Sequence, residues 1–193
     1  RDRTLRIIHN LSFVEDPTRI LRAARFEVRF GMHLSKHAEQ LTANAVQMGL
    51  LDKVAGIRIF TEFSMLLQET RPWAILARLN ALGVLTAIHP RLVIGGTTER
   101  RFQRTAEVLT WHELQYLAEQ PVPWRVYLLV LLEERPGTEA RAILRRLSPP
   151  PKTADTIGRG LVRLRALARS LLRARGVVPS RVYRWLADAP VEV

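Results

Sequence analysis

The sequence contains no cysteine, which excludes disulfide bonds and thiolate metal sites in this chain. No apolar run approaches the roughly 18 residues that a membrane-spanning helix needs. With 193 residues, of which 47% are hydrophobic, the chain is long enough to bury a core. We therefore expect a cytoplasmic protein that has no membrane partner.

The five histidines do not have the spacing of a metal site. His33 and His37 are four residues apart, but Ser35 between them reads as a helix cap, so the two imidazoles would not share one helical face. His112-Glu113 lacks a second histidine at position 116, where Tyr116 stands, so it is not a zinc-protease motif. We predict no metal site in this chain.

Positive charge is in excess and unevenly distributed. The net charge is +12; residues 1–138 carry 18 basic and 14 acidic side chains, whereas residues 139–193 carry 12 and 4. The preference for arginine over lysine, 27 to 3, can reflect genomic base composition, but that does not explain the excess of charge. The +8 segment indicates contact between the C-terminal third and RNA.

Helix signals dominate the chain, and strand-length alternation of β-branched residues is absent, so we predict an all-α, multi-helical fold. Ser148-Pro-Pro-Pro151 is the clearest linker. Proline, glycine and capping residues predict helices at about 17–30, 35–46, 57–68, 72–83, 97–117, 126–132, 138–147 and 153–175, with a short last helix from Pro179.

The segment 13–31 is the most informative. Glu15 and Asp16 precede Pro17, which suits a first helical position, and Gly31 suits a helix end. The helix between them places arginines 19, 22, 25 and 29 on one face and apolar residues on the opposite face. A stripe of guanidinium groups headed by carboxylates suits an anionic ligand that also offers hydrogen-bond donors, and a nucleotide meets both conditions.

This segment also resembles a known family. Together with His9-Asn-Leu-Ser-Phe13, the stretch Glu15-Asp-Pro-Thr-Arg-Ile-Leu-Arg-Ala-Ala-Arg-Phe26 is similar to the region after the catalytic domain of class II template-independent tRNA nucleotidyltransferases. These are the bacterial CCA-adding and A-adding enzymes, with poly(A) polymerase as a close relative. Arg58-Ile-Phe-Thr-Glu62 resembles the Arg-x-x-x-Glu motif of the same neck region, and the similarity continues to about Pro90.

The resemblance implies that Asp16 and Arg19 read the Watson–Crick edge of the incoming nucleotide, with Arg22 and Arg25 nearer its sugar and phosphates. Cytosine and adenine both present an amine donor beside a ring-nitrogen acceptor, whereas uracil and guanine present the reverse. The pattern of residues alone leaves a simpler alternative, in which Asp16 caps the helix and Arg19 is its i,i+3 partner. In the nucleotide-reading case Glu15 can take over the capping.

The resemblance implies that Arg58 and Glu62 have a structural role and stabilise the nucleotide pocket from behind, with Glu15 in a supporting role. The alternative for Arg58 and Glu62 is an i,i+4 ion pair on a helix surface, worth a few tenths of a kcal/mol. Ile57 stands where many relatives carry an acidic residue before that arginine.

In this family the chemistry lies in a head domain with a Gly-Ser turn and an Asp-x-Asp pair that binds Mg2+, and neither motif occurs here. We therefore expect a neck and body region that binds no metal and is inactive alone, with ATP or CTP and the 3′ end of tRNA or another RNA as partners of the whole enzyme. The expected division is a junction at 1–14, a base-recognising neck at 15–70, a helical body at 71–150 and the basic start of a tail at 151–193.

Two other classes of function remain open. One is a helical RNA-binding module without catalytic activity, and the other is a protein-interaction scaffold. The +8 segment and the lack of any repeat at a fixed period disfavour the scaffold. The sequence does not distinguish CCA addition from A addition or poly(A) synthesis.

Overall fold

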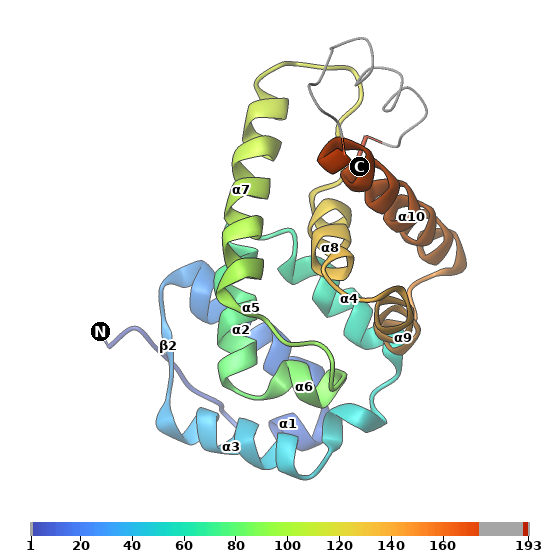
Figure 1. Cartoon of the computed structure of the whole chain (residues 1–193). Helices are drawn as coiled ribbons and strands as arrows, with labels where there is room; N and C mark the ends of the chain where they lie inside the picture. Colours follow the sequence, from blue (N-terminus) through green and yellow to red (C-terminus); the bar gives the residue numbers. More distant parts are fainter. Residues whose placement is uncertain (1, 174–190, 193) are drawn as a thin grey trace.

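The computed structural model describes residues 2–173 and 191–192, and the regular secondary structure of this part is almost entirely helical, as predicted (Figure 1). Two short strands, β1 and β2, pair in parallel, with Thr4 opposite His33 and Leu5 opposite Leu34. None of the described helices is both long and apolar enough to span a membrane. In chain order the elements are β1 (Thr4–Leu5), α1 (Ser12–Glu15), α2 (Thr18–Phe30), β2 (His33–Leu34), α3 (Lys36–Gln47), the 3-10 helix η1 (Leu50–Lys53), α4 (Gly56–Leu66), α5 (Pro72–Ala81), α6 (Val84–Ile88), α7 (Gly96–Glu113), α8 (Pro123–Glu133), α9 (Gly137–Leu147) and α10 (Pro151–Arg173).

Several helix ends lie where proline, glycine and serine predicted them. Helix α2 follows Pro17 and ends at Gly31, which has a left-handed φ of 60°. Helix α3 follows Ser35, whose hydroxyl accepts a hydrogen bond from the Ala38 N–H at 3.1 Å. Helix α5 has Pro72 in its first turn. These boundaries depend on groups within one turn of the chain, which is why the sequence is sufficient to predict them.

Other boundaries were wrong. Helix α7 begins at Gly96 and is not capped by Thr97 or Thr98. The Thr98 side chain is buried and its hydroxyl donates at 2.6 Å to Glu134, the residue that follows α8. The same helix ends at Glu113 and not near 117. Helix α8 begins at Pro123, three residues before the predicted start, because proline is accepted in a first turn. The predicted end of the 153–175 helix and the helix from Pro179 lie outside the described residues.

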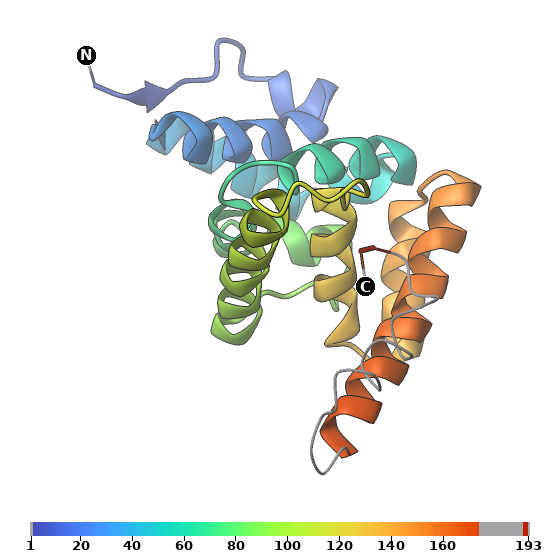
Figure 2. The ribbon, with the colours of Figure 1, turned by 90° about the horizontal axis from the view of Figure 1, so that it is seen from above.

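The helices form two adjoining groups. Helices α1 to α6 occupy the lower part of Figure 1, where α2 packs against α4 and α5. In the upper part α8 lies between α7 and α10, an arrangement that the view from above also shows (Figure 2). Helix α4 contacts α8 and α9 and so joins the two groups. One hydrophobic core runs through both groups, from Phe13 to Leu161.

A buried carboxylate holds α2 in position. Glu27 accepts hydrogen bonds from the Leu34 N–H at 2.9 Å and from Arg78 Nε at 2.7 Å. Arg78, on α5, also pairs with Glu39 on α3. Four elements therefore meet at this arginine and glutamate, and they set the direction in which α2 presents its other face.

Arginines also connect the C-terminal helices to the rest of the molecule. Arg146 of α9 donates to the carbonyl oxygens of Leu51 and Val54, at 2.7 and 3.3 Å. At the same junction Gly56, the first residue of α4, approaches α9 so closely that a Cβ would lie 2.4 Å from the Arg146 carbonyl oxygen. Helix α4 is thus fixed against α9 by backbone contact.

Candidate functional site

The predicted site residues meet where α1, the start of α2 and α4 come together. Asp16 has an extended backbone between α1 and α2, with φ at −145°, and Pro17 then begins the helical path. Asp16 Oδ1 accepts hydrogen bonds from the Thr18 N–H at 3.1 Å and from the Thr18 hydroxyl at 2.6 Å. The carboxylate therefore makes the type of short-range hydrogen bond that the capping interpretation predicts.

Asp16 also has a partner that is distant in the sequence. Arg58 Nη2, on α4, lies 3.0 Å from Asp16 Oδ1. Burial acts to raise the pKa of Asp16, but the two Thr18 hydrogen bonds and the positive charges of Arg58 and Arg19 outweigh it, so the pKa lies below its ordinary value. The carboxylate is ionised although only 20% of the side chain is exposed. Within the described residues, all of its hydrogen-bond and ion-pair contacts involve Oδ1.

Arg19 does not form the i,i+3 pair with Asp16. Its Nη1 donates to the Ser12 carbonyl and hydroxyl oxygens, at 3.3 and 2.9 Å, and lies 3.4 Å from Glu15 Oε2. Helix α1 lies beside the first turn of α2 and offers these oxygens, so the guanidinium turns back toward α1. Nε and Nη2 of Arg19 have no hydrogen-bond partner among the described residues, so one edge of the group is unused.

The remaining arginines of α2 face carboxylates from α4 and the turn after it. Arg22 Nε lies 4.0 Å from Glu62 Oε1, Arg25 Nε lies 3.8 Å from Glu69 Oε1, and Arg29 Nη1 lies 3.4 Å from the same Glu69 oxygen. The Arg25 side chain is only 13% exposed, so the arginines do not form the fully open stripe that the sequence predicted. Glu69 was missed, because it lies in the turn after α4, where helical spacing gives no signal of its position.

Glu62 is the most deeply buried carboxylate facing the arginines of the site, with 14% of its side chain exposed. Burial raises its pKa above the ordinary value, and the nearby charges of Arg25 and Arg22 reduce this shift without cancelling it. Glu62 Oε2 and Arg25 Nε are both buried without a hydrogen-bond partner in the described chain. The alternative interpretation of Arg58 and Glu62 as an i,i+4 ion pair does not hold, because the Arg58 guanidinium reaches the Asp16 carboxylate instead.

A surface pocket of about 380 Å³ lies beside this network. Arg19 and Arg22 line it from α2 together with the ring of Phe26, and Ser12 lines it from α1. The segment 5–9 forms the opposite wall. Guanidinium donors, a hydroxyl and an aromatic surface thus border one cavity, and Asp16 is not among its lining residues. This combination suits a ligand with a flat ring and anionic groups.

Comparison with known proteins identifies similar chains. Residues 31–94 match the family described as the probable RNA and SrmB-binding site of polymerase A. An A-adding tRNA nucleotidyltransferase of Geobacter sulfurreducens is 39% identical over the whole of this chain, and one of Aquifex aeolicus is 30% identical over 91% of it. The chain spans about a fifth of the length of these relatives, 22% and 21% respectively.

Solved structures are similar over nearly the entire chain. A tRNA nucleotidyltransferase complexed with a primer tRNA and an incoming ATP analog superposes with a TM-score of 0.77 at 29% identity, covering 99% of this chain and 55% of that one. A tRNA-processing enzyme with CTP gives a TM-score of 0.80 at 30% identity, covering all of this chain and 52% of that one. The arrangement of helices is therefore shared along with the sequence.

Proposed function

Because the chain belongs to the tRNA nucleotidyltransferase and poly(A) polymerase family, of which it carries the helical neck and body region, we propose that the site at α1, α2 and α4 selects the base of an incoming nucleotide. Other helices of this region contact the RNA that receives it. The whole protein would transfer AMP or CMP to the 3′ end of a tRNA or a similar RNA.

One observation carries this proposal. Asp16 is ionised and engaged only through Oδ1, and Arg19 is engaged only through Nη1, within the described residues. Asp16 Oδ2 thus remains an acceptor, and Arg19 Nε and Nη2 remain donors. Adenine and cytosine present a complementary pair, an exocyclic amine beside a ring nitrogen that accepts. Uracil and guanine present a carbonyl and a ring N–H there, which would leave both charged groups unpaired at considerable cost.

The other arginines take different roles in the proposal. Arg22 lines the pocket and is about half exposed, so we assign it contact with the sugar or phosphates. Arg25 is mostly buried between Glu62 and Glu69, so its contribution to nucleotide binding comes chiefly from orienting those carboxylates. Arg58 supports the site by holding Asp16, Glu15 supports it by holding Arg19, and Glu62 supports it from behind Arg22.

Transfer of a nucleotidyl group in such enzymes would use Mg2+, which stabilises charge at the reacting phosphate. Within residues 2–173 and 191–192, no three His, Asp or Glu side chains are grouped in a way that could hold a metal ion. The residues described therefore do not fit a magnesium site, and we assign to them base selection and RNA contact. ATP or CTP and RNA are the proposed partners.

The test exploits the 39% identity to the Geobacter enzyme over this whole chain. In a chimera in which this chain replaces the matching region of that enzyme, kcat/KM is measured for all four nucleoside triphosphates. Asp16→Asn should slow addition of the proper nucleotide and relax discrimination against UTP and GTP. Asparagine caps a helix about as well as aspartate, so unchanged selectivity would mean that Asp16 is only a cap.

Thr18→Val is the matched control for this experiment. It removes one hydrogen bond to Asp16 Oδ1 but leaves the carboxylate and its Arg58 contact in place. It should lower stability slightly and leave the ranking of the four triphosphates unchanged. A change of ranking in the control equal to that of Asp16→Asn would show that the helix start, and not the carboxylate, determines selection.

A further inference from the structure

Arginines in the C-terminal helices fall into two groups. Some are used within the fold: Arg146 binds the carbonyl oxygens of Leu51 and Val54, and Arg165 of α10 binds those of Leu132 and Arg135. By contrast, Arg141 and Arg145 of α9 are exposed and make no hydrogen bond or ion pair with any described residue. Their charge has no role in holding this part of the molecule together.

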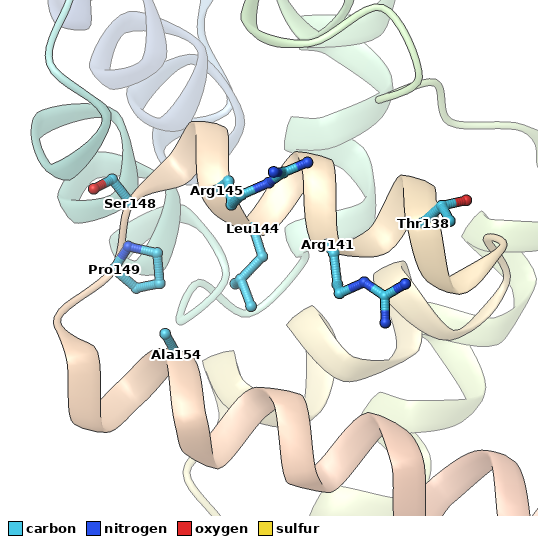
Figure 3. A pocket seen from close by; sticks show the side chains of 7 residues that line it. All are labelled: Thr138, Arg141, Leu144, Arg145, Ser148, Pro149 and Ala154. Atoms are coloured by element: carbon cyan, nitrogen blue, oxygen red, sulfur yellow. The ribbon is translucent and has the colours of Figure 1, made fainter.

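These two arginines border a groove of about 520 Å³ between α9 and the first turns of α10. Figure 3 shows Arg141 and Leu144 directed from α9 toward α10, with Ala154 facing Leu144 from the other side. Leu144, Pro149 and Ala154 form an apolar part of its lining. Both arginines come from α9; Arg141 is directed toward α10, whereas the Arg145 side chain runs along α9 (Figure 3). Thr138 and Ser148 add hydroxyl groups near its two ends.

The groove carries positive charge without a nearby acid to neutralise it. None of its lining residues is acidic. The two acidic side chains closest in sequence are already paired, Glu139 with Arg91 at 3.6 Å and Asp155 with Arg159 at 2.9 Å. The α10 side of the groove is formed by a small residue, Ala154, and one turn further along α10 a Cβ added at Gly158 would meet nothing within 4 Å. An extended ligand can therefore lie along the groove.

We propose that the α9/α10 groove, lined by Arg141, Arg145, Ser148 and Ala154, binds the sugar–phosphate backbone of the RNA, an inference that rests on the proposed function. Arg141 and Arg145 are four residues apart on a helix, about 6 Å of rise, which is similar to the separation of successive phosphates along an RNA strand. A guanidinium group donates to two phosphate oxygens at once. The apolar lining suits the faces of the riboses between them.

The experiment measures binding of a tRNA transcript to this chain by fluorescence anisotropy at several salt concentrations. Arg141→Ala/Arg145→Ala should weaken binding roughly tenfold at low salt and reduce the slope of log K against log salt by about 1 to 2, since two phosphate contacts are lost. Arg100→Ala/Arg104→Ala on α7 removes the same formal charge from another surface and should change both quantities much less. Arg141→Lys/Arg145→Lys should retain most of the salt slope, because the charge remains.

Two outcomes would overturn the inference. Wild-type affinity and slope in the Arg141/Arg145 double alanine variant would remove the groove from RNA binding, and so would an equal loss in the α7 variant, which would reflect net charge alone. Binding of ATP to the same variants separates this inference from base selection. If ATP affinity is unchanged while tRNA affinity falls, the groove acts on the RNA backbone only. If the Asp16→Asn test fails, the tRNA result still stands by itself.

Discussion

Arg58 Nη2 lies 3.0 Å from Asp16 Oδ1, although 42 positions separate the two residues in the chain. The contact joins the first turn of α4 to the turn that begins α2. It places a positive charge against a carboxylate that burial alone would tend to protonate. The lowered pKa of the proposed base reader thus owes part of its shift to a second helix, after the two Thr18 hydrogen bonds.

We predict that Arg58→Ala raises the pKa of Asp16 toward its ordinary value, because one of the two stabilising positive charges is lost while the Thr18 hydrogen bonds remain. NMR titration of the Asp16 carboxyl carbon measures the shift. A depressed pKa contributes stability that is present above the unfolded value, near 3.8, and is lost as pH falls through the folded value. Arg58→Lys, which retains the charge, should restore most of the depression; identical pKa values in all three proteins would assign the shift to Thr18.

The raised pKa of Glu62 predicts that its contribution to stability depends on pH with the opposite sign to that of Asp16. Its folded pKa is raised, so its contribution to stability is fully present below the unfolded value, near 4.5, and is lost as pH rises through the folded pKa. The amide introduced by Glu62→Gln cannot ionise, so this variant should not lose that stability as pH rises. Thermal unfolding from pH 4 to pH 7 should therefore show the difference in Tm, variant minus parent, increasing with pH. A difference that is constant with pH would contradict the raised pKa.

The buried Glu27–Arg78 contact predicts a large effect on stability. Arg78→Ala leaves Glu27 buried with only the Leu34 N–H as a partner, and breaking such a pair from one side costs about 3 kcal/mol. Arg159→Ala removes the partner of Asp155 in an exposed i,i+4 pair and should cost under about 0.5 kcal/mol. Urea unfolding of both variants gives the comparison; similar small losses would show that Glu27 remains solvated without Arg78.

Gly56 predicts a steric effect at the junction of α4 and α9. The Cβ of Gly56→Ala would lie 2.4 Å from the Arg146 carbonyl oxygen and 2.7 Å from the Ser148 Cβ, so the two helices must separate. We expect a loss of about 1–3 kcal/mol in the free energy of unfolding. Gly96→Ala is the matched control, since its Cβ meets nothing within 4 Å and should leave stability unchanged or slightly increased. Equal stability of both variants would mean that the junction relaxes freely.

Helix boundaries were predicted correctly from the sequence where the residue that sets the boundary acts within its own turn of the chain. Pro17, Ser35 and Gly31 act on the backbone within a turn of their own positions, so the bounds of α2 and α3 followed from them. Prediction from sequence failed for β1 and β2, whose two-residue pairing joins Thr4 to His33 and depends on how α2 returns the chain. It failed for Thr98 because the carboxylate that accepts from its hydroxyl belongs to Glu134, which is 36 positions away at the end of α8.

The sequence by itself determined the helical class and the concentration of charged groups on α2, because the helical repeat assigns each residue to a face without reference to the rest of the fold. Only the tertiary structure decided which charged groups, on α2 and on the other helices, remain available to bind a ligand. It paired Arg25 with Glu69 and Asp16 with Arg58, used Arg146 and Arg165 to bind backbone carbonyls, and left Arg141 and Arg145 without partners in the part of the chain that the structure describes. The physical reason is that ion pairs form between groups that packing brings within about 4 Å, and most of these partners lie 30 or more positions apart in the chain.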